Sequence, residues 1–123
     1  MTNEVKRPAV LFGKTREIDC GCGKMFVTLN CFALFEGDKP VPFEVFIQLG
    51  KAGGCANANM ESMARLISWG LRSGASLDEA VEHLRDITCH LPVFHGAKSC
   101  ADAAAVALME LHGLMAALAG EKE

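Results

Sequence analysis

The strongest constraint on the fold is the stretch of residues 100–119, CADAAAVALMELHGLMAALA, which is apolar on nearly every side when wound as a helix. Such a helix has no polar face to turn to water, so it belongs in the centre of a core or against a partner subunit. Ser99 precedes it and Asp102 stands three positions later, the spacing of a capping box. We therefore predict a helix from about Cys100 to Ala119, with Ser99 as its N-cap and Asp102 reaching back to the Ser99 amide.

Two segments in the first half of the chain alternate between apolar and polar residues, as half-buried strands do. Residues 24–36 (KMFVTLNCFALFE) and 43–49 (FEVFIQL) each place apolar side chains at every second position. The connection between them, GDKPVP, is short and contains two prolines, which favours a turn. We therefore predict an antiparallel hairpin. The REID segment before Cys20 indicates a further, short edge strand.

Helical periodicity appears twice between the predicted hairpin and the last helix. Apolar residues recur at helical spacing from about Asn57 to Arg72, and Gly74 is suited to end that helix. Ser76 and Glu79 form a capping box for a second helix. Its apolar side extends to about Ile87, which is expected to point inward.

The order of these elements predicts the fold class. Strand, strand, helix, helix, loop and helix make an α+β domain, in which three helices pack on one face of a small antiparallel sheet. The sheet consists of the hairpin and the edge strand. Residues 1–14 are expected to form an N-terminal arm, and residues 15–123 a single domain.

Composition argues against several classes of protein. The net charge is -3, which gives nothing to attract a polyanion, so nucleic-acid binding is not expected. The N-terminal sequence MTNEVKRPAV lacks the apolar core of a signal peptide. On this interpretation no apolar run approaches the roughly 18 residues of a membrane span. We therefore expect a cytoplasmic protein with no membrane segment.

Four of the six cysteines stand at junctions between predicted elements. Their positions are Cys22 before the first long strand, Cys55 before the first helix, Cys89 after the second helix and Cys100 in the first turn of the last helix. A reducing compartment does not favour structural disulfides. Four thiolates brought together would suit a closed, tetrahedral zinc site. The chain has no C-x-x-C pair, so zinc binding, redox chemistry and four unrelated thiols all remain open.

The other cysteines and loops offer further interpretations. Cys31 alternates with the apolar side of its strand and is predicted to be core. Cys20 and Cys22 form the only close pair, and a C-x-C disulfide closes a tight, strained ring that is readily reduced. The GKAGG segment before the first helix offers amides to an anion, although its spacing is not that of a phosphate-binding loop. His90 and His95 are alternative ligands in the loop before the last helix.

Four segments resemble a known family. In chain order they are GCGKMFVTLN, PFEVFIQLGKAGGC, MARLISWGLRSG and SCADAAAVAL. Together they are similar to the TSCPD domain, which occurs at the C-terminus of adenosylcobalamin-dependent ribonucleotide reductases and also as small stand-alone proteins. The resemblance covers about residues 15–112. In the name-giving motif Lys98 replaces threonine and Ala101 replaces proline, whereas Ser99, Cys100 and Asp102 are kept.

The resemblance implies a metal site and a role. The family pattern has one cysteine at each of the positions of Cys22, Cys55, Cys89 and Cys100, which implies that these four bind zinc, whereas Cys20 and Cys31 are additional to the pattern. It also implies an accessory or binding domain that is not catalytic by itself, with a ribonucleotide reductase or a related protein as its partner. A homodimer through the last helix is a further expectation. The alternative is a redox module that supplies electrons to a reductase through Cys20 and Cys22.

Overall fold

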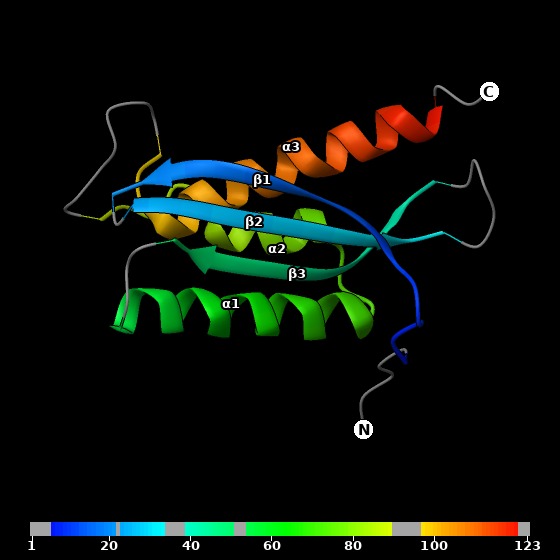
Figure 1. Cartoon of the computed structure of the whole chain (residues 1–123), viewed down its shortest axis with the longest axis horizontal. Helices are drawn as coiled ribbons and strands as arrows, with labels where there is room; N and C mark the ends of the chain where they lie inside the picture. The colour runs from blue at the N-terminus through cyan, green and yellow to red at the C-terminus, as the bar shows by residue number, and fades with distance from the viewer. Residues whose placement is uncertain (1–5, 22, 34–38, 51–53, 90–96, 121–123) are drawn as a thin grey trace.

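The computed structural model describes residues 6–21, 23–33, 39–50, 54–89 and 97–120. Within these ranges the chain forms one antiparallel sheet in the order β1-β2-β3, flanked by helices (Figure 1). The elements are β1 (Phe12–Cys20), β2 (Gly23–Phe32), β3 (Val41–Leu49), α1 (Gly54–Arg72), α2 (Leu77–Leu84) and α3 (Cys100–Gly120). The predicted α+β fold with a small antiparallel sheet is confirmed.

The edge strand β1 is longer than the REID segment suggested. It pairs with β2 over its whole length, from Phe12 opposite Cys31 to Cys20 opposite Gly23. The strand therefore begins inside the stretch 1–14 that was predicted to be an arm. Its alternation is weak because an edge strand needs few apolar side chains, and Phe12 itself is 63% exposed.

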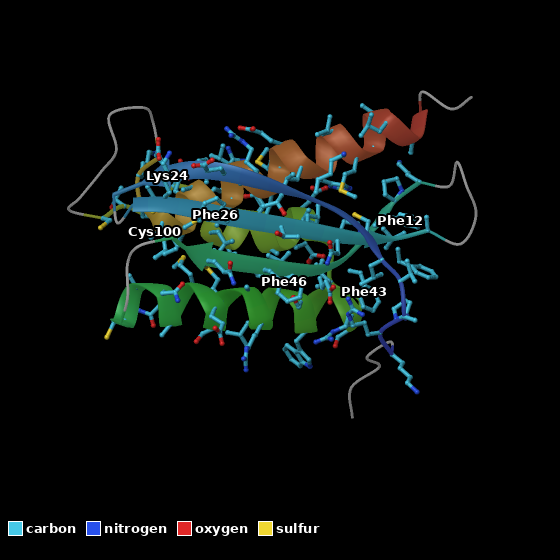
Figure 2. All side chains as sticks on the ribbon, in the orientation of Figure 1. Phe12, Lys24, Phe26, Phe43, Phe46 and Cys100 are labelled. Atoms are coloured by element: carbon cyan, nitrogen blue, oxygen red, sulfur yellow. The ribbon has the colours of Figure 1, made fainter. Side chains whose placement is uncertain are left out.

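One face of the sheet carries the core. The buried strand residues on this face are Met25, Val27, Leu29, Cys31, Val45, Ile47 and Leu49. α2 and α3 lie behind the sheet on this face (Figure 1). Small alanines on the buried side of α3 allow the helix to approach the strands closely. The opposite face is more open, with Phe26 and Phe46 partly exposed (Figure 2).

The first helix, α1, covers the outer edge of β3. The Ser68 hydroxyl accepts a hydrogen bond from the Val45 N–H at 2.9 Å and donates one to the Val45 carbonyl at 3.1 Å. The Asn57 side-chain oxygen accepts a hydrogen bond from the Leu49 N–H at 3.0 Å. These contacts satisfy backbone groups that an edge strand would otherwise offer to another chain. α1 starts at Gly54, three residues before the predicted Asn57.

The end of α1 follows the prediction. Gly74 adopts a left-handed φ of 104°, and the Ala75 N–H donates to the Gly70 carbonyl at 2.9 Å. This is the hydrogen-bond pattern of a Schellman motif, which turns the chain out of a helix at glycine. The chain then enters α2 through the predicted capping box of Ser76 and Glu79, which is confirmed.

The second helix ends earlier than its apolar pattern predicts. α2 stops at Leu84, and Ile87 is 48% exposed, so the inward position predicted for Ile87 is wrong. Arg85 is extended and Asp86 adopts a left-handed φ of 65°. The Asp86 N–H donates to the Asp102 carboxylate of α3 at 2.8 Å, which replaces the next helical hydrogen bond.

The last helix, α3, corrects one expectation from the sequence. Among the described residues it alone is long and apolar enough to cross a membrane, with a mean hydropathy of 1.4 over Cys100–Ala119. Length and composition are weak evidence for a membrane span, because the core helix of a soluble protein passes the same test. Here 44% of the window is buried inside the fold. An ion pair between Arg16 of β1 and Glu110 of α3, at 2.6 Å, also fastens the helix to the sheet.

Candidate thiol centre

The predicted cysteine junctions lie at one end of the molecule. The end of β1, the starts of β2 and α3, the end of β3 and the start of α1 all lie on this side, on the left of Figure 1. Lys24 and Cys100 mark this end in Figure 2, whereas Phe12 and Phe43 mark the opposite end. The antiparallel sheet and the long helices place chain positions that are far apart in sequence at this common end.

Two thiols are in contact at this end. The Sγ atoms of Cys20 and Cys100 lie 3.1 Å apart, although the two residues are separated by 80 positions. Cys20 is the last residue of β1 and is only 6% exposed, whereas Cys100 is the first residue of α3 and is partly buried. Sequence reasoning treated Cys20 as additional to the family pattern and missed this contact. The available signal was its two-residue spacing from Ile18, which places both on the covered side of β1.

The start of α3 is held by buried polar contacts. The Ser99 hydroxyl accepts a hydrogen bond from the Asp102 N–H at 3.0 Å, which confirms the predicted N-cap. The Asp102 carboxylate is directed elsewhere than predicted. It accepts hydrogen bonds from the backbone N–H groups of Lys98 at 2.9 Å and Asp86 at 2.8 Å, and its residue is 6% exposed. The side chain therefore anchors the first turn of α3, and with it Cys100, to the segment that follows α2.

A second contact joins the same two segments at the surface. The Lys98 ammonium group lies 3.0 Å from the Asp86 carboxylate. The hydrogen bond from Lys98 is the main reason why the pKa of Asp86 lies below its ordinary value. Both side chains are at least half exposed, so this pair adds little stability by itself.

Cys89 and Cys55 approach the same end by different routes. The Cys89 N–H donates to the Lys98 carbonyl at 2.9 Å, which brings the chain after α2 alongside the start of α3. Cys55 lies in the first turn of α1 and is exposed. β3 ends and α1 begins on this side of the molecule (Figure 1), where the Gly50 N–H, just after β3, donates to the Lys24 carbonyl at 2.8 Å.

The predicted four-cysteine set is only partly visible. Cys22 lies outside the described residues, so its position relative to Cys55, Cys89 and Cys100 is not given. Within the described part of the chain, no three histidine, cysteine, aspartate or glutamate side chains form a group able to hold a metal ion. The zinc site therefore stays a prediction. His90, His95 and residues 51–53 of the proposed anion loop also fall outside the described residues.

The remaining cysteine is part of the core, as predicted. Cys31 is 1% exposed, and burial raises the pKa of its thiol to about 11. Its Sγ donates to the Met115 Sδ at 3.8 Å, so its near neighbour is a thioether of α3 and not a second thiol. Cys31 is therefore the least reactive of the described cysteines and a natural control for the others.

A groove of about 450 Å³ lies elsewhere, between β3 and α1. Its polar lining includes Gln48, Glu61 and Arg65, and none of the described residues that line it is a cysteine. Glu61 and Arg65 are paired with each other across one helical turn at 2.8 Å. The groove is therefore separate from the thiol centre.

Comparison with known protein families gives a match over nearly the whole chain. The model of the TSCPD domain family matches residues 2–112. Searches of curated proteins and of solved structures find no match. The matched range contains every element of the fold except the last turns of α3.

Proposed function

Because the chain belongs to the TSCPD domain family, we propose that it is a zinc-binding accessory domain of a cytoplasmic ribonucleotide reductase or a related protein, without catalysis of its own. The candidate ligands are Cys22, Cys55, Cys89 and Cys100. The observation that carries the proposal is that the segments of three of these cysteines lie at one end of the molecule, where the Cys89 N–H donates to the Lys98 carbonyl at 2.9 Å just before Cys100.

The chemistry of sulfur supports a metal at this end. Zinc favours four thiolate ligands at about 2.3 Å, which places the sulfurs about 3.8 Å from one another. A disulfide bond is about 2.05 Å long. The 3.1 Å between the Cys20 and Cys100 sulfurs is shorter than the separation of two zinc ligands and longer than a disulfide bond, so Cys20 is a neighbour of Cys100 and is not counted among the four ligands. Cys20 would therefore stand beside any metal that Cys100 holds.

A metal here would act mainly on stability. It would join the start of β2, the start of α1, the segment after α2 and the start of α3, most of which are far apart in sequence. Closing such long loops restrains the unfolded chain, so the free energy of metal binding becomes free energy of folding. A domain stabilised in this way presents a rigid surface to a partner protein.

Elemental analysis of the purified full chain tests the proposal. We expect about one zinc per chain, with a melting temperature that falls on chelation and recovers when zinc is added back. Cys55→Ser, Cys89→Ser and Cys100→Ser should each lose zinc. Cys31→Ala is the matched control, because it also removes a thiol but should keep the metal. A folded chain without zinc, whose melting temperature does not change on chelation, would contradict the proposal.

The alternative function, electron delivery through Cys20 and Cys22, makes a different prediction. In that case Cys20→Ser abolishes disulfide exchange with the partner and leaves the zinc content unchanged. The neighbouring thiol of Cys100 supports thiol chemistry at Cys20. The burial of Cys20 argues against direct attack by a partner protein. Zinc binding is therefore the function that we favour.

A further inference from the structure

The contact between Cys20 and Cys100 joins two rigid elements. Cys20 ends a strand that is fully paired with β2, and Cys100 starts a helix that is anchored through Ser99 and Asp102. A disulfide needs its sulfur atoms to approach from 3.1 Å to about 2.05 Å, a shift of about 1 Å. Rotation about side-chain bonds can supply a movement of this size, so neither element has to be displaced.

We propose that Cys20 and Cys100 are an oxidisable thiol pair, which closes into one intrachain disulfide when the domain meets a small-molecule disulfide. The partly buried Cys100 is the residue that the reagent reaches, and the buried Cys20 is the residue that completes the reaction. The same chemistry is closed to Cys31, which is fully buried beside the Met115 thioether.

The reaction balances without any other reactant. The Cys100 sulfur attacks one sulfur of the small disulfide, which breaks that bond and releases one thiol. The resulting mixed disulfide is attacked by the Cys20 sulfur, which releases the second thiol. The two cysteines lose two electrons and two protons, and the small disulfide gains them as two thiols. A reducing thiol in excess reverses both steps.

The consequence for metal binding rests on the proposed function. Cys100 is both a proposed zinc ligand and one half of the thiol pair, and its sulfur cannot serve both at once. Bound zinc should therefore protect the pair from oxidation, and the disulfide should lower the zinc content. Because Cys20 was identified as additional to the family pattern, this control would be a property of chains that carry a cysteine at this position.

Peptide mapping tests the pair directly. The metal-free full chain is treated with oxidised glutathione, remaining thiols are blocked, and the protein is digested with trypsin without reduction. Cleavage after Arg16 and Lys24 leaves Cys20 and Cys22 in one peptide, and cleavage after Lys98 frees the peptide that contains Cys100. We expect these two peptides to be joined, and fragmentation at Gly21 to place the bond on Cys20. Dithiothreitol should separate them.

Cysteine variants show which residue forms the disulfide with Cys100, and a folding check shows that a lost disulfide is not the result of misfolding. Cys22→Ser should keep the joined peptides, whereas Cys20→Ser and Cys20→Ala should lose them. Circular dichroism of the two Cys20 variants checks that the fold is retained. A bond from Cys22 to Cys100, a bond within the Cys20–Cys22 peptide, or glutathione adducts alone would each overturn the proposal.

A zinc arm separates this proposal from the proposed function. With one equivalent of zinc, formation of the joined peptides should slow several-fold. If the pair forms without metal and the chain binds no zinc, the pair stands and the zinc function fails. If zinc binds but does not slow the oxidation, the claim that Cys100 serves the metal and the disulfide in turn is overturned.

Discussion

The two ends of the sheet are closed by side chains of opposite chemistry. Where β3 starts, the buried Glu44 carboxylate accepts two hydrogen bonds from Arg7, both at 2.9 Å, and one from Asn30 at 2.8 Å. Where β1 ends, the thiols of Cys20 and Cys100 are in contact. The carboxylate has its charge balanced within the chain, whereas a thiol pair can still bind a metal or lose electrons. A buried reactive group therefore does not indicate a functional site by itself. It does so when, like the thiol pair, it can still bind a ligand or react.

The largest expected effect is that of Asp102→Ala, which tests whether the thiol end depends on its polar anchor. The change removes the acceptor of the Lys98 and Asp86 N–H groups. Because these are hydrogen bonds to a charged group, we expect the free energy of unfolding to fall by about 2–3 kcal/mol in urea denaturation. Formation of the disulfide between Cys20 and Cys100 should slow in the same variant.

Asp102→Asn is the matched control, because it keeps one acceptor oxygen at the same place. It should lose less stability than the alanine variant and should retain more of the disulfide. An alanine variant within about 0.5 kcal/mol of the unchanged protein would mean that the anchor does not hold the start of α3.

Glu44→Gln tests the ion-paired end and should have an intermediate effect, about 1 kcal/mol at pH 7. The pKa of Glu44 lies below its ordinary value, mainly because Arg7 donates hydrogen bonds to it. Since the folded state binds the proton less readily, the stabilisation is complete above the unfolded pKa of about 4.3. It is lost as the pH falls through the lower pKa of the folded state. Urea denaturation from pH 7 to pH 3 measures this slope, which should flatten in the variant.

Glu17→Gln is the control for this measurement. Glu17 pairs with Lys24 at 3.0 Å, but its side chain is 50% exposed, so its removal should change stability little. Equal slopes for the Glu44 variant and the unchanged protein would show that Arg7 does not stabilise the charged form of Glu44.

The smallest effect on stability is expected on the outer side of α3, between the two ends. Met109 and Leu114 are 50% and 48% exposed there, and we propose that a second copy of the chain covers them. Met109→Glu should convert a dimer into a monomer in sedimentation equilibrium while the unfolding free energy of the monomer changes by about 0.5 kcal/mol or less. Leu66→Glu, at an exposed position of α1, is the control. An unchanged chain that is monomeric at high concentration contradicts this proposal.

Much of the fold could be predicted because the type and the ends of most elements depend on sequence patterns a few residues long. The alternation around Cys31, the capping box of Ser76 and Glu79 and the stop at Gly74 each depend on neighbours within a few residues. The full length of β1 could not be predicted, because Phe12 and its exposed neighbours are held by pairing with β2 and not by their own hydrophobicity. The early end of α2 could not be predicted for a similar reason, because the Asp102 carboxylate that accepts the Asp86 N–H belongs to another helix.

The amino-acid sequence by itself determined the element types, the start of α3 at Cys100 and the core position of Cys31, because hydrophobic period and capping act over one or two turns. Only the tertiary structure decided that Cys20 meets Cys100 and that Asp102 holds the segment after α2. Those contacts depend on the register of β1 against β2 and on how α3 docks across them. Both result from packing the whole core at once, and no short stretch of the chain records them.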